Sequence, residues 1–202
     1  MKTLYIYYVM KIKLKDISTI KLGYSIRERI EASFASDAIG IIFPKDIFDN
    51  DRIDFENVTS VKIPNASKFI LDDNEILLQS RGKFIAVVYK QPLNKKFIAS
   101  SLLLRIIVNS PDFLPEYIAL YLNSQIGQAE LNRLSSTLTI KSIVKSELDK
   151  LEIPILPLDL QKKLVEYSKI FNNWIKLNEK QLSLQIKIFN NIIDKIIGDN
   201  NG

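Results

Sequence analysis

The stretch Gln79-Ser80-Arg81-Gly82-Lys83 stands between two apolar runs, Ile76–Leu78 and Phe84–Val88. It places an amide, a hydroxyl, a guanidinium and an ammonium group side by side, and all four are hydrogen-bond donors. Gly82 permits a tight turn with positive φ, so that neighbouring side chains can approach another surface closely. The chemistry this pattern favours is recognition of a polar or anionic ligand rather than bond cleavage.

The cations are unevenly distributed along the chain. Residues 79–111 contain six cations and no carboxylate, residues 131–146 contain only cations, and residues 45–56 contain five acids against two bases. A local positive field of this kind fits nucleic acid, the commonest large anion of the cytoplasm. A solvated lysine-rich surface is the alternative.

Absent residues exclude most catalytic chemistries. The chain has no histidine and no cysteine, which rules out Ser-His and Cys-His bases, disulfides and the usual zinc sites. Its few glycines cannot form a phosphate-binding loop or a dinucleotide fingerprint, and the Asp/Glu-x-Lys pair of many nucleases does not occur. A metal-dependent nuclease remains an alternative hypothesis. Its metal site would be built on an acidic cluster, Asp46, Asp49, Asp51 and Asp54.

The elements that must position these residues alternate between short strands and short helices. Strands are predicted at 6–12, 39–43, 58–63, 76–79, 84–88, 97–99, 102–108 and 153–155, and helices at 115–124, 126–134 and 142–148. We predict a mixed α/β (α+β) domain over residues 1–157. No apolar stretch approaches the roughly 18 residues of a membrane span, and we expect a cytoplasmic protein.

Residues 158–202 are predicted to form one long helix, because no proline or glycine occurs from Leu158 to Ile197. Its apolar residues repeat every eleven positions, which gives a nearly straight stripe that we expect a second chain to cover. The interface residues on this stripe are Leu160, Leu164, Phe171, Ile175, Leu182, Ile186 and Ile193. Packing of the helix on its own domain is the alternative.

Short motifs follow one another in order along residues 11–197. They are Lys13-Leu14-Lys15-Asp16-Ile17, Gly23-Tyr24-Ser25 with Arg27, 72–82 (DDNEILLQSRG), Leu114-Pro115-Glu116-Tyr117, Tyr121-Leu122-Asn123-Ser124, Thr139-Ile140-Lys141-Ser142, and 153–158 (IPILPL) with Gln161. This series resembles the target recognition domain and spacer helix of type I restriction-modification specificity subunits. Members of that family usually carry two such domains and two helices, whereas this chain has one of each.

The resemblance implies which residues contact DNA. Arg81 would bind guanine or phosphate, Gln79 adenine, and Ser80 and Lys83 phosphates. Two further candidate groups are Tyr24, Ser25, Arg27 and Arg29, and Arg133, Thr139, Lys141 and Ser142, the last at an expected helix start. The alternatives are an internally bonded hairpin with Arg81 paired to Asp72 or Asp73, and Tyr24 as core packing.

The resemblance also implies the function and the partners. A non-catalytic subunit would dimerise through its helix, recognise a bipartite site on double-stranded DNA, and recruit a methyltransferase subunit and a restriction subunit. S-adenosylmethionine and ATP would belong to those partners, so no cofactor is expected here. A helical interaction scaffold without DNA affinity is the competing hypothesis.

Overall fold

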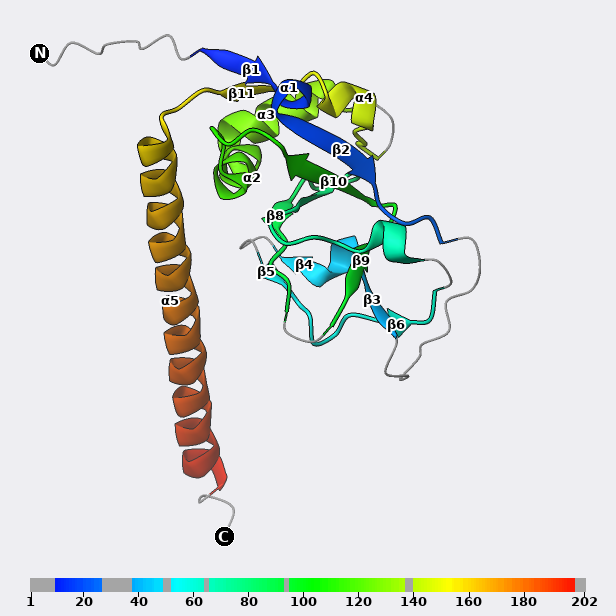
Figure 1. The fold of residues 1–202 in the computed structure, drawn as a ribbon. Coiled ribbons are helices and arrows are strands. Elements are labelled where there is room, and N and C mark those ends of the chain that lie inside the picture. The colour runs from blue at the N-terminus through cyan, green and yellow to red at the C-terminus, as the bar shows by residue number, and fades with distance from the viewer. Residues whose placement is uncertain are drawn as a thin grey trace, which may run out of the picture. The chain divides into compact units, whose positions relative to one another are not determined.

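The computed structural model describes residues 10–26, 38–48, 52–63, 66–92, 95–136 and 140–198. The chain forms two compact units, Met1–Lys162 and Lys163–Gly202. The first is a mixed α/β body and the second consists of the greater part of one long helix (Figure 1). This is the fold class predicted from the sequence. No helix within the described ranges is both long and apolar enough to cross a membrane.

The central sheet has the strand order β2-β10-β7-β8, and every neighbouring pair is antiparallel. Its strands are β2 (Ser18–Leu22), β7 (Ile76–Gln79), β8 (Ala86–Val88) and β10 (Leu103–Val108). Branched aliphatic residues dominate these segments because such side chains pack well on a pleated, half-buried surface. All of β7 is buried, so the polar turn that follows it starts from a fixed strand end.

The described residues of the body also form three smaller sheets. β3 (Ile39–Ile42) pairs antiparallel with β6 (Ser60–Val61) and parallel with β9 (Phe97–Ala99). The other two sheets are the antiparallel pairs β1 (Lys11–Lys13) with β11 (Glu152–Pro154), and β4 (Ile47–Phe48) with β5 (Arg52–Ile53). The β1–β11 pair joins the beginning of the described chain to the segment before the long helix.

Short helices cover parts of the body. They are α1 (Leu14–Ile17), α2 (Pro115–Asn123), α3 (Gln125–Leu134), α4 (Lys145–Leu148) and the 3-10 helices η1 (Pro44–Asp46) and η2 (Ala66–Phe69). Pro115 occupies the first turn of α2, where its missing N–H would have no helical partner anyway. Asn123 Oδ1 accepts a 2.9 Å bond from Ala86 N, and its Nδ2 donates a 2.8 Å bond to Ala86 O. This side chain therefore satisfies the edge of β8 as another strand would.

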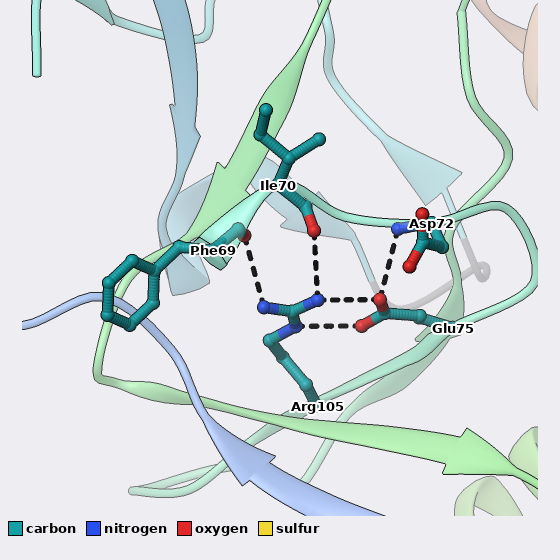
Figure 2. Close-up of polar contacts among 5 residues, drawn as sticks. All are labelled: Phe69, Ile70, Asp72, Glu75 and Arg105. Carbon is teal, nitrogen blue, oxygen red and sulfur yellow. Dashed lines mark hydrogen bonds and ion pairs between the residues drawn. The ribbon is translucent and has the colours of Figure 1, made fainter. Parts of the chain in front are cut away.

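A buried ion pair ties the central sheet to η2. Arg105 Nε and Nη2 donate to the Glu75 carboxylate at 2.7 and 2.6 Å, and Arg105 also donates to the carbonyls of Phe69 and Ile70 (Figure 2). The two side chains are only 4% and 2% exposed. Arg105 is one of the six cations of residues 79–111, and its burial removes it from the surface charge.

Helix α5 (Leu158–Gly198) confirms the predicted long helix. Its first turn is fixed within the body by Gln161, which is fully buried. Gln161 Nε2 donates to the carbonyls of Asp112 and Leu156 at 2.7 and 2.8 Å, and Oε1 accepts from Leu114 N at 2.9 Å. Gln161, which follows Pro157 and Leu158 in the sequence, thus anchors the start of the helix.

Most predicted elements occur within one to three residues of their expected bounds. The strand expected at 6–12 is described only as Lys11–Lys13, since residues 6–9 lie outside the described ranges. Several short elements were not predicted, and β2 and α1 are among them. The reason at these two is that the apolar residues of this segment stand at positions 14, 17, 20 and 22, a spacing that fits neither a strand nor a helix throughout.

Candidate nucleic-acid interface

The turn after β7 has the geometry that its sequence predicts. Gly82 has a φ of 73°, which L side chains rarely adopt, and it is exposed. Gly82 N donates to Lys141 O and Ile143 N donates to Ser80 O, both at 2.9 Å. Arg81 and Ser142 form an antiparallel bridge between these bonds. Two candidate groups far apart in the sequence therefore lie on one surface.

Two of the predicted residues are used inside the protein. Gln79 is 6% exposed and its Nε2 donates a 3.0 Å bond to Pro44 O. The Ser80 hydroxyl donates a 2.8 Å bond to Leu102 O, which also accepts from Ser80 N at 3.0 Å. These bonds hold the turn in place, and this geometry favours a supporting role for both side chains.

Arg81 is exposed at the end of the turn. No hydrogen bond or ion pair joins its guanidinium to another residue of the described ranges. The alternative pairing with Asp72 or Asp73 is not present: Asp73 Oδ1 instead accepts a 2.9 Å bond from Gln91 N. Arg81 is thus available for an external acceptor. Lys83, one residue after Gly82, is exposed as well.

The third quarter of the chain contributes a second set of cations. Lys141 Nζ donates a 2.7 Å bond to Asn132 Oδ1, and Arg133 binds the Glu130 carboxylate within α3. Ser142 Oγ lies 3.0 Å from Ser136 Oγ, and Thr139 lies outside the described residues.

The helix expected to start at Ser142 begins instead at Lys145 and has four residues. Ser142 has extended backbone because it bridges Arg81. The predicted helix terminus beside Ser142 is therefore wrong.

Tyr24 belongs partly to the protein interior. Its ring makes an edge contact with Phe69 at 5.1 Å, and its backbone bonds Ala99 O and Ser101 N. The preceding Gly23 is required, because a Cβ there would lie 2.0 Å from Ser100 O. Ser25 is exposed, whereas Arg27 and Arg29 lie outside the described residues. The geometry of Tyr24 favours the packing alternative.

Two hollows lie on either side of the turn. The first, the Arg81 hollow, has a volume of about 570 Å³ and is lined by β2, the turn, segment 101–104 and segment 142–149, with Arg81 and Lys145 among its residues. The second, the Lys83 hollow, has about 440 Å³ and is lined by Lys83, Lys141 and the amides of Asn123, Gln128 and Asn132. Each hollow thus combines cations with other hydrogen-bonding groups on an open surface.

The acidic cluster is not arranged as a metal site in the part that can be described. Burial raises the pKa of Asp46, whose Oδ2 accepts a 2.8 Å bond from Phe43 N. A hydrogen bond from the Asn57 side chain lowers the pKa of Asp54. Asp49 and Asp51 lie outside the described residues, and no group of three potential ligands occurs within them.

Sequence reasoning missed the apolar residues of the Arg81 hollow. Leu22, Leu102 and Val144 are 61%, 40% and 58% exposed there. The sequence predicts that Leu102 begins a core strand, but β10 starts one residue later. The two serines before Leu102 are the only sequence signal that the chain is still turning at this point.

Comparison with known proteins gives a family match. The profile of the type I restriction modification DNA specificity domain matches residues 7–187. Comparison with curated protein sequences gives no significant match.

Solved structures share the fold. A chain from a study titled "Structural basis underlying complex assembly and conformational transition of the type I R-M system" is similar, with a TM-score of 0.64 and 15% identity over 87% of this chain and 41% of that one. The S subunit from M. genitalium gives 0.53 and 18% over 86% and 41%. The HsdS subunit from Thermoanaerobacter tengcongensis gives 0.57 and 14% over 85% and 39%. The chain therefore spans about two fifths of the length of these solved chains.

Proposed function

Because the chain belongs to the type I restriction modification DNA specificity domain family, we propose that it is a non-catalytic DNA-recognition subunit of a type I restriction-modification complex. In this proposal it binds double-stranded DNA in the cytoplasm. Methylation and cleavage belong to a methyltransferase subunit and a restriction subunit, which use S-adenosylmethionine and ATP. No cofactor is assigned to this chain.

The observation that supports DNA binding most directly is the surface formed by residues 80–83 and 141–143. Backbone bonds from Gly82 and Ile143 hold two sequence-distant segments together there. That surface carries the exposed cations Arg81, Lys83 and Lys141. Guanidinium and ammonium groups on a rigid backbone suit phosphates and the acceptor edge of guanine. The proposed DNA-contacting residues are therefore centred on this turn.

Helix α5 supports pairing of two chains. Phe171, Leu182 and Ile186 from the predicted stripe are 58%, 58% and 52% exposed. An apolar stripe of this length requires a partner. We propose that two copies pair through α5 and thereby hold two recognition domains at a fixed separation, so that the DNA site is bipartite and palindromic. The proposed domain boundary lies at residues 157/158.

The apolar surface of α5 is wider than one partner helix covers. At 3.6 residues per turn, its exposed apolar side chains span roughly 220° around the axis, whereas one packed face spans about 100°. The additional arc includes Ile170, Trp174, Leu177 and Ile188, which are 57% to 66% exposed. This width supports a further helical partner beside the second copy, and we assign that place to the methyltransferase subunit.

The test is DNA affinity measured against salt. We expect the purified chain, alone or with its methyltransferase subunit, to bind a labelled duplex with a steep salt dependence. The triple variant Arg81→Ala, Lys83→Ala, Lys141→Ala should reduce the slope of log K against log salt by about 0.9 for each phosphate that the variant no longer neutralises.

A charge-matched control variant is available in Lys68→Ala, Lys96→Ala, Lys150→Ala, whose lysines are exposed and line neither hollow. Its slope should stay close to that of the wild type. Salt-insensitive or absent DNA binding, or an equal reduction in both variants, contradicts the proposal.

The exposed apolar arc of α5 also favours the second candidate, a helical scaffold. That function predicts chains that pair normally and show no DNA affinity in the same titration.

A further inference from the structure

The Arg81 hollow combines a guanidinium with an exposed apolar surface. Leu22, Leu102 and Val144, which come from three separate segments, present their side chains there. Isolated exposed aliphatic residues are ordinary. Three that gather beside an arginine whose guanidinium binds no other described residue require an explanation.

The backbone around the hollow is fixed before any ligand binds. Leu102 O accepts bonds from both Ser80 N and Ser80 Oγ. Leu22 lies on β2 opposite Leu104, and Ile143, next to Val144, donates to Ser80 O. The backbone positions that carry the apolar side chains and Arg81 are therefore held in one arrangement, as a specificity site requires.

The polar groups of the hollow favour a ligand that offers hydrogen-bond acceptors. Arg81 and Lys145 line it, and its carboxylate, Asp149, lies 3.9 Å from Lys145 Nζ. In the major groove of DNA, guanine offers two acceptors to arginine, and the C5-methyl group of thymine is the apolar group that a leucine or valine can contact.

We propose that the Arg81 hollow recognises a thymine methyl group next to a guanine in the major groove. This inference rests on the DNA-recognition function proposed above and assigns base specificity to its site. Arg81 donates to guanine O6 and N7, and Leu102, with Leu22 and Val144, contacts the methyl group. The polar Lys83 hollow, on the other side of the turn, faces the phosphates.

The experiment uses duplexes selected by the chain, with its methyltransferase subunit, from a random-sequence pool. Each thymine of the selected site is replaced in turn by deoxyuridine, which lacks only the methyl group. We expect replacement at one position of each half-site to weaken binding about fourfold, the value of one buried methylene-sized group.

Leu102→Ala and Val144→Ala should bind the thymine and deoxyuridine duplexes almost equally. The control Ile126→Ala, at an apolar position that is 67% exposed and lies outside the hollow, should keep the fourfold preference. Two variants are tested so that loss of the methyl contact can be told apart from misfolding of a single variant.

Other outcomes overturn the inference in distinct ways. If a specific site is selected but no deoxyuridine changes the affinity, or if the Leu102 and Val144 variants keep the preference, the methyl interaction is refuted while DNA recognition stands. If these variants bind DNA normally but no longer bind the methyltransferase subunit, the hollow is a protein-docking site. If no sequence is selected, the proposed function fails and the inference fails with it.

Discussion

Arg81 and Arg105 lie in the same cation-rich segment but have opposite environments. Arg105 is enclosed by Glu75 and two backbone carbonyls, whereas Arg81 is exposed on a turn. The sequence does not show which acid pairs with Arg105, because residues 79–111 contain no carboxylate. Strand pairing determines the burial of Arg105, because it places this residue on the central strand β10, opposite Leu77 and Lys21.

Removing the charge of Glu75 should destabilise the body strongly. Glu75→Gln keeps the side chain's size but leaves Arg105 buried without its counterion, and removal of one partner of a buried pair costs about 3–5 kcal/mol. Urea unfolding should show this decrease in unfolding free energy. Lys150→Ala, which breaks the exposed Lys150–Glu147 pair, should cost less than about 1 kcal/mol. Similar decreases in both variants would contradict the structural role given to Glu75.

Two buried tyrosines should respond differently to removal of their hydroxyl groups. Tyr117 OH donates a 2.8 Å bond to Pro154 O, whereas the hydroxyl of Tyr89 has no partner among the described residues. At pH 7, Tyr117→Phe should cost about 1 kcal/mol of unfolding free energy, and Tyr89→Phe should cost nothing or stabilise the protein. Equal effects in thermal or urea unfolding would count against these assigned environments.

The same tyrosines predict an alkaline loss of stability. Burial raises the pKa of Tyr89 and of Tyr117 to about 12, from an ordinary value of 10.0. Because the folded pKa is the higher one, the associated stability is complete below pH 10 and is lost as pH rises through about 12. Either Phe substitution should make the decline of unfolding free energy shallower between these limits. A decline identical to that of the wild type would refute the raised pKa of the substituted tyrosine.

At the scale of elements, sequence periodicity predicted the strands and helices whose formation depends on local residues. The apolar run Ile76–Leu78, Pro115 at a helix start and the uninterrupted residues 158–197 all correspond to observed elements. The turn at Gly82 also followed from its residues.

Tertiary contacts determined the rest. The bridge of Arg81 to Ser142 joins residues 61 positions apart, and Gln79 turns inward to Pro44. Neither contact leaves a pattern in the sequence.

Helix α5 allows a direct test of pairing. Leu182→Glu places a charge in the middle of the proposed interface, and we expect it to convert a dimer into a monomer because an unpaired buried charge is costly. Lys180→Glu, on the polar side of the same helix, should leave the dimer intact. Light scattering after size exclusion should give twice the 23.2 kDa chain mass for the wild type and the control. A monomeric wild type at micromolar concentration would refute symmetric pairing and leave a different half-subunit as the partner.

At the scale of the whole molecule, the described residues form one recognition domain and one long helix, α5, and the chain spans about two fifths of the solved chains that share its fold. Pairing of two copies would restore two recognition domains, now related by a true twofold axis. Symmetric pairing therefore predicts that the twofold symmetry of the protein is matched by a palindromic DNA site. This relation holds whichever bases each recognition domain contacts.

Selection of bound duplexes from a random-sequence pool, by the chain together with its methyltransferase subunit, tests this relation most directly. A twofold-symmetric pair of recognition domains should enrich two identical half-sites in inverted orientation, separated by a gap of constant length and variable sequence. Enrichment of one contiguous half-site, of half-sites with variable spacing, or of no sequence would contradict it.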